Sequence, residues 1–145
     1  MSETWPFPFP PPSGFERLIG LEIVEATGDR VVGTLDVDDR HKQPYGIVHG
    51  GVYCSIVETL GSIGAAVWGL ERGIQAVVGV SNTTDFLRSV REGAVTGVAT
   101  PVHRGRSQQL WQVEVTRSSD GKPVARGQVR LHNLTDAESI GGVGG

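Results

Sequence analysis

The architecture of this chain depends on residues 50–68, Gly50-Gly-Val-Tyr-Cys-Ser-Ile-Val-Glu-Thr-Leu-Gly-Ser-Ile-Gly-Ala-Ala-Val-Trp68. Apolar residues recur here at spacings of four, four, three and four, which is the period of one helix face. These residues are Val52, Ile56, Leu60, Ile63 and Val67. The segment therefore predicts one long helix.

The predicted helix carries almost no charge. Glu58 is the only formally charged residue between Gln43 and Leu70, whereas a helix that faces solvent carries Lys, Arg and Glu on its outer side. The side opposite the apolar stripe carries the small residues Gly51, Ser55, Ser62 and Ala65. We therefore expect a sheet to wrap the helix on nearly all sides and to bury Glu58.

Strand-like patterns lie on both sides of this helix. A short helical turn is predicted at 15–19, and strands are predicted at 21–26, 31–37, 77–86, 94–103, 107–118 and 124–132. Gly28-Asp29 separates the first two strands as a hairpin turn. The order is a strand pair, one long helix and then an antiparallel meander. This order predicts an α+β domain with a single central helix.

Composition sets the outer limits. With 145 residues and a net charge of −3, the chain suits one domain at 14–133 and not a broad nucleic-acid surface. Residues 1–13 form an arm rich in Pro and aromatic residues, which is disordered, lies on its own domain or binds a partner as a polyproline ligand. Residues 134–145 are expected to be a flexible Gly-rich tail. The single cysteine, the lack of a secretory signal and the absence of an apolar run of spanning length predict a cytoplasmic protein without membrane contact.

The candidate chemistry gathers around the helix start. A lone acid in a dry setting is either satisfied by hydroxyls or Arg88, or is a general base or nucleophile, and we favour the second reading for Glu58. The first-turn N–H groups after His49-Gly50-Gly51 are unpaired donors suited to a developing oxyanion. Cys54 is expected to be a small buried residue rather than a nucleophile. No metal site is predicted, because the histidines lack ligand spacing.

The segment Gln43-Pro-Tyr-Gly-Ile-Val-His49-Gly50-Gly51-Val-Tyr-Cys-Ser-Ile-Val-Glu58 resembles the signature of hotdog-fold acyl-CoA thioesterases. The resemblance is to the phenylacetate-degradation branch and to the Arthrobacter-type 4-hydroxybenzoyl-CoA thioesterases, and it spans about residues 15 to 132. It implies the hotdog fold, in which an antiparallel sheet wraps one long central helix.

The resemblance also implies roles for individual residues. Glu58 matches the catalytic carboxylate, and the Gly50 N–H matches the donor that polarises the thioester carbonyl. His49 shapes that turn, Gln43 hydrogen-bonds near the reacting group, and Ser62 orients water. Positions that would contact the coenzyme A nucleotide are Arg88, Arg106 and Ser107, although Arg106 replaces a small hydroxyl residue there.

The resemblance implies hydrolysis of an acyl-CoA, with coenzyme A as part of the substrate and no separate cofactor. The alternatives are a hotdog dehydratase or hydratase and a non-catalytic acyl-CoA-binding module. Trp68, Tyr53 and Phe86 could line an aromatic or a fatty-acyl pocket equally well. About 12 Å of helix separates Gly50 from Glu58, so we expect a homo-oligomer, a dimer or a tetramer, whose active sites are shared between chains.

Overall fold

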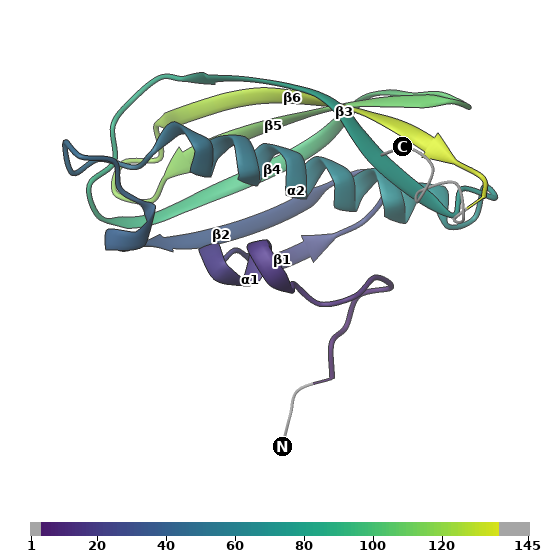
Figure 1. Ribbon diagram of the computed structural model, residues 1–145, viewed down its shortest axis with the longest axis horizontal. Coiled ribbons are helices and arrows are strands. Elements are labelled where there is room, and N and C mark those ends of the chain that lie inside the picture. The colour runs from purple at the N-terminus through teal and green to yellow at the C-terminus, as the bar shows by residue number, and fades with distance from the viewer. Residues whose placement is uncertain (1–3, 137–145) are drawn as a thin grey trace.

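The computed structural model describes residues 4–136 as an antiparallel sheet with one long helix along its concave side (Figure 1). The helices are α1 (Gly14–Ile19), the 3-10 turn η1 (Asp39–His41) and α2 (Gly50–Gly69). The strands are β1 (Glu22–Ala26), β2 (Val31–Val37), β3 (Ala76–Phe86), β4 (Gly93–Arg104), β5 (Gln108–Arg117) and β6 (Pro123–Leu134). Each predicted helix and strand is present within two residues of its expected bounds, whereas the turn η1 was not predicted.

The order of the strands corrects one expectation. The sheet runs β1-β2-β4-β5-β6-β3, so the hairpin β1–β2 and the meander β4–β5–β6 are present, but β3 pairs with β6 and not with β4. After α2 the chain therefore forms the far edge of the sheet as β3, and then passes back across the sheet to place β4 beside β2. As a result β3 lies at an edge of the sheet and runs beside α2, which places the segment after the helix close to the helix itself.

The helix packs through the predicted stripe, but the stripe turns along its length. Ile56 and Leu60 are fully buried, whereas Ile63 is only partly buried against the core. Further along, Ala65 is fully buried and the Trp111 ring lies against Gly64. Ala65, which the sequence placed opposite the apolar stripe, is therefore part of the core, and its carbonyl accepts a hydrogen bond from the buried Gln109 side chain.

Helix α2 is also long and apolar enough, by length and composition, to cross a bilayer. This differs from the expectation that no segment approaches such a length. In the fold the helix lies along the sheet, where most of its contacts are with β3, β4, β5 and β6. Burial against these strands accounts for the apolar side chains on that face of the helix, whereas the face that carries Gly51 and Glu58 is exposed.

The aromatic side chains of the N-terminal arm contact one another. Residues 4–13 form no helix or strand and lead away from α1 (Figure 1). The Trp5 ring lies 5.0 Å from that of Phe7 and 5.7 Å from that of Phe9, and the Trp5 indole N–H donates to the Phe9 carbonyl at 2.6 Å. At the other end β6 continues to Leu134, and residues 137–145 of the predicted tail lie outside the described residues.

Candidate active site

The start of α2 presents one unpaired backbone donor. His49 is the N-cap residue, and its Nδ1 accepts the Gly51 N–H at 2.8 Å. The Gly50 N–H has no acceptor among residues 4–136. A Cβ at Gly50 would overlap the Phe86 ring, which is 55% exposed, so a side chain fits here only if that ring moves. The helix start therefore offers the Gly50 N–H to a ligand, whereas the Gly51 and Val52 N–H groups, which the sequence also predicted to be unpaired, have acceptors.

A cavity of about 310 Å³ opens beside this donor. It brings together three predicted site residues, Gln43, Gly50 and Arg88. The rest of its lining is Ile47, Val48, Tyr53, Phe86, Leu87 and Ser89. Tyr53 and Phe86 thus line a pocket as expected, whereas Trp68 lies at the far end of α2.

Two polar side chains of this cavity keep donors free. The Gln43 amide oxygen accepts the Tyr45 N–H, which leaves the amide NH₂ available. Arg88 is exposed and uses one guanidinium nitrogen to donate to the Pro123 carbonyl at 2.7 Å. The cavity can therefore donate to a carbonyl at its Gln43 and Gly50 end and to an anion at its Arg88 end.

Tyr53 contributes a feature that sequence reasoning missed. Its side chain is 2% exposed, and its hydroxyl is the buried side-chain polar atom of residues 4–136 that has no hydrogen-bond partner. Burial raises the pKa of Tyr53 to about 12, with a smaller opposing effect of the Arg117 charge. The hydroxyl therefore keeps its proton at neutral pH.

Glu58 lies on the open side of α2, and the expectation that it is buried is wrong for the single chain. The sheet covers one side of the helix only, so Glu58 and Gly51 are exposed, and Ser55 and Ser62 are half-buried. Ser62 follows Glu58 by one helical turn, and its hydroxyl has no partner among the described residues. Neither Glu58 nor Ser62 lines the cavity that contains Gly50.

Strand β3 positions the Glu58 side chain. A Cβ on Gly79 would lie 2.6 Å from Glu58 Oε1, so the absence of a side chain at Gly79 leaves room for the carboxylate. Close by, Asn82 Nδ2 donates to the Cys54 carbonyl at 3.0 Å and ties β3 to the helix one turn before Glu58. Sequence reasoning missed both residues, because their roles depend on the crossing of β3.

A second cavity, of about 520 Å³, lies on the other side of the helix start. His49, Gly51 and Ser55 line it together with apolar residues of α1. His49 therefore belongs to a different cavity from Gln43 and Gly50, and its role at the helix start is to hold the Gly51 N–H.

Four arginines lie close together in the sequence but in two separate places in the structure: Arg88, Arg91, Arg104 and Arg106. Arg88 and Arg91 precede β4, whereas Arg104 ends this twelve-residue strand and Arg106 follows it. At about 3.3 Å per residue the two pairs lie about 40 Å apart. One chain therefore cannot direct all four at a single nucleotide.

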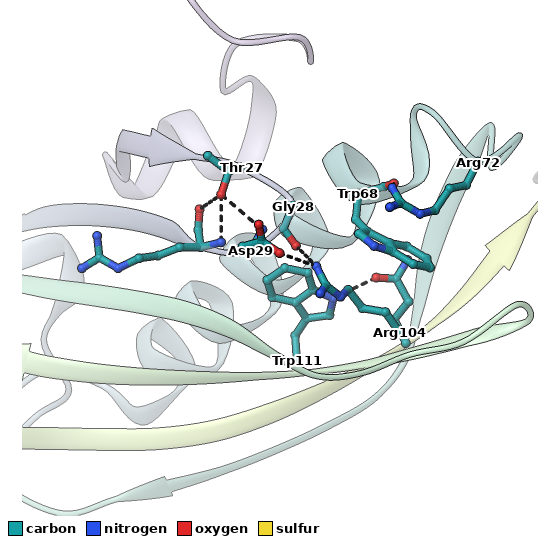
Figure 2. Close-up of polar contacts among 9 residues, drawn as sticks. Thr27, Gly28, Asp29, Trp68, Arg72, Arg104 and Trp111 are labelled. Atoms are coloured by element: carbon teal, nitrogen blue, oxygen red, sulfur yellow. Dashed lines mark hydrogen bonds and ion pairs between the residues drawn. The ribbon is translucent and has the colours of Figure 1, made fainter.

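Arg104 is held by its own fold. Its Nη1 donates to the Gly28 carbonyl at 2.6 Å and pairs with Asp29 at 2.7 Å, and its guanidinium lies 5.5 Å from the centre of the Trp68 ring (Figure 2). Arg106 and Ser107 are exposed in the turn between β4 and β5, and their side chains have no partner among residues 4–136. Of this pair of arginines, Arg106 is the one available to a ligand.

No three His, Cys, Asp or Glu side chains of residues 4–136 are grouped so that they could hold a metal ion. Cys54 is a free, half-buried thiol. The chemistry that the described residues offer is that of a carboxylate, a backbone donor, an amide and two separated basic positions.

Known proteins share this fold and sequence. Residues 45–124 match the family model described as the thioesterase superfamily. The structure of Rv1847/MT1895 from Mycobacterium tuberculosis is 48% identical, with a TM-score of 0.79 over 83% of this chain and 95% of that one. A thioesterase structure from Haemophilus influenzae is 36% identical, with a TM-score of 0.74 over 80% of this chain and 79% of that one.

A relative of named substrate is the 1,4-dihydroxy-2-naphthoyl-CoA hydrolase of Escherichia coli, which is 40% identical over 60% of this chain and 62% of its own length. The family match and these relatives confirm the expected hotdog fold and thioester hydrolysis as the class of reaction. The chain belongs to the thioesterase superfamily.

Proposed function

We propose that this protein hydrolyses an acyl-CoA thioester to the carboxylic acid and free coenzyme A. The observation that carries the proposal is the cavity in which the unpaired Gly50 N–H, the free Gln43 amide and the exposed Arg88 meet. A thioester carbonyl needs a donor for the charge that develops on its oxygen, and a coenzyme A carries phosphates for a guanidinium. The name of the Escherichia coli relative agrees with a CoA thioester as substrate.

In the proposed reaction the Gly50 N–H donates to the carbonyl oxygen and the Glu58 carboxylate acts on its carbon. Glu58 either takes a proton from water, whose oxygen then adds to the carbon, or adds directly and forms an acyl-enzyme anhydride that water hydrolyses. In both cases the carbon–sulfur bond breaks and the leaving thiolate of coenzyme A takes up a proton. The free Ser62 hydroxyl suits a role in orienting the water.

We further propose that two chains build each site. Gly50 opens into one cavity, whereas Glu58 lies on the open side of the same helix and outside that cavity. Strand β3 is an edge strand of eleven residues whose only charge is Asp85, and Val80 and Phe86 on it are more than half exposed. Such an edge can pair with a second copy. Two antiparallel helices would then place the start of one beside the middle of the other.

The same arrangement would bring Arg88 of one chain close to Arg106 of the partner subunit. Arg88 lies at the end of the fold where α2 begins, and Arg106 and Ser107 lie at the end where α2 finishes. In an antiparallel pair Arg88 of one chain lies at the same end as Arg106 of the partner subunit. A nucleotide bound there would contact both, which is how the three predicted coenzyme A residues could act together.

The test compares acyl-CoA with acyl-N-acetylcysteamine, which has the same thioester but no nucleotide, with detection of the free thiol. We expect a much higher kcat/KM for acyl-CoA, because binding energy from the remote nucleotide can be used at the reacting carbonyl. Equal values would contradict a nucleotide site. Binding of acyl-CoA without thiol release would favour a binding module, and hydration of an enoyl-CoA without thiol release would favour a hydratase.

A further inference from the structure

The turn between β4 and β5 is held from inside the molecule by one residue. Asn133 Nδ2 donates to the Gly105 carbonyl at 3.0 Å and to the Arg106 carbonyl at 3.2 Å. The Asn133 backbone N–H donates to the Ser107 carbonyl at 2.8 Å. Three successive carbonyls of the turn therefore bind to a single residue of β6, which is only 6% exposed.

The same side chain connects the turn to the central helix. Asn133 Oδ1 accepts from Gln109 Nε2 at 3.0 Å, and this nitrogen also donates to the Ala65 carbonyl of α2 at 3.2 Å. Gln109 Oε1 in turn accepts the Trp111 indole N–H at 2.9 Å. Gln109 and Trp111 are fully buried. A buried network in which each side chain has its partners gives its members one arrangement.

This support contrasts with the freedom of the turn's outer side. Arg106 and Ser107 are exposed and their side chains have no partners among the described residues, although their carbonyls are bound inward. A surface turn needs no interior asparagine for its own stability, because water can satisfy its carbonyls. Holding the backbone in advance reduces the entropy lost when a ligand binds to the outer side.

We propose that Asn133 is a positioning residue that presets the 105–107 turn to bind the phosphate groups of a coenzyme A nucleotide. The proposal rests on the proposed acyl-CoA activity and deepens it, since it names a residue that acts on binding through Arg106 and Ser107. Asn133 itself does not touch the substrate. It acts by fixing the direction of the turn, so its loss changes nucleotide binding and leaves the thioester chemistry intact.

The experiment replaces Asn133 by Leu, which has similar volume and no hydrogen bonds, and by Ser, which keeps one donor. We expect Asn133→Leu to raise KM for acyl-CoA about tenfold, the size of one lost charge-assisted hydrogen bond, with kcat nearly unchanged. The dissociation constant of adenosine 3′,5′-bisphosphate, measured by calorimetry, should rise by the same factor. For Asn133→Ser, both the KM and the dissociation constant should lie between those of Asn133→Leu and those of the unmodified protein.

Two controls separate positioning from general loosening. Hydrolysis of acyl-N-acetylcysteamine, which has no phosphate, should keep its kcat/KM within about twofold in every variant. Trp111→Phe removes a hydrogen bond of the same network without touching the turn, so it should lower stability and leave KM for acyl-CoA unchanged.

A proportional loss with both substrates, an unchanged KM, or an equal rise of KM in Trp111→Phe would overturn the role of Asn133. Failure of the proposed function looks different, because the unmodified protein would then hydrolyse no acyl-CoA. In that case binding of adenosine 3′,5′-bisphosphate still tests the turn, since it needs no turnover: a tenfold loss in Asn133→Leu supports the proposal, and an unchanged affinity contradicts it.

Discussion

Glu58 and Gly79 lie against each other, and the carboxylate of the helix occupies space that any side chain on the strand would need. A Cβ on Gly79 would lie 2.6 Å from Glu58 Oε1. The backbone of Gly79 has no positive φ, so alanine fits this strand position without backbone strain. The position of the Glu58 carboxylate therefore depends on Gly79, a residue of β3 that takes no part in the proposed reaction.

We expect Gly79→Ala to lower kcat by about 10- to 100-fold. The new methyl group would displace the Glu58 carboxylate from the position in which it can reach the thioester carbon or the attacking water. The end of a Glu side chain moves easily, and alanine suits a strand better than glycine does, so the free energy of unfolding should stay the same or rise by up to about 1 kcal/mol. Ser81→Ala, two residues along the same strand, is the matched control and should change neither quantity. Unchanged turnover in Gly79→Ala would separate Glu58 from the reaction.

Glu58→Gln should lower single-turnover hydrolysis by about 100-fold or more, since the amide keeps the shape but loses basicity and nucleophilicity. Because Glu58 is exposed in the single chain, the thermal midpoint should hardly move. Glu71→Gln, an exposed acid just after α2, is the control and should keep full activity. An active Glu58→Gln enzyme would refute the proposed mechanism.

Mixed chains test whether two copies build each site. Glu58→Ala chains and Gln43→Ala chains are each expected to be nearly inactive. Refolded together in equal amounts, they should recover about a quarter of full activity, because half of the random dimers contain one intact site. Gln43 is preferred to Gly50 for this purpose, since a side chain at Gly50 would collide with Phe86. A mixture as inactive as its parents would place each site within one chain.

Tyr53→Phe should leave the protein at least as stable at pH 7, because it removes a buried hydroxyl that has no partner. The pKa of Tyr53 is raised to about 12 in the folded chain, so folding retains a proton that the unfolded chain loses at its ordinary pKa near 10. The stability from this group is therefore complete below pH 10 and is lost as pH rises toward 12, with a slope of up to ~1.4 kcal/mol per pH unit.

Alkaline denaturation curves check this. The original protein should lose stability between pH 10 and 12 more steeply than Tyr53→Phe. Parallel curves would show that the tyrosine does not ionise differently in the two states.

Arg104→Ala and Arg106→Ala should have opposite effects. Arg104→Ala loses a partly exposed ion pair with Asp29 and the contact with Trp68, which should cost about 1 kcal/mol of unfolding free energy with little change in KM. Arg106→Ala should leave stability unchanged and raise KM for acyl-CoA. Chemical denaturation measures the stability of the two variants, and steady-state kinetics measures their KM. A raised KM in Arg104→Ala would show that Arg104 also contributes to nucleotide binding.

The amino-acid sequence alone was enough to predict a helix at 50–68, the six strands and unpaired donors at the helix start. These features are local: they follow from the spacing of Val52, Ile56 and Leu60, from alternation in the strands, and from the capping of a helix start. The motif from Gln43 to Glu58 is also a continuous stretch of sequence, so the family resemblance could be identified without the structure.

The tertiary structure decided what depends on contacts distant in the chain. Because β3 pairs with β6, Gly79 and Asn82 lie beside α2. The hydrophobic periodicity of a strand does not predict which edge of the sheet it will join. The low charge of the helix predicted burial by its own sheet. The sheet of one chain covers only one side of the helix, so Glu58 is exposed. Arginines close in sequence were separated because a strand of twelve residues carries its two ends far apart.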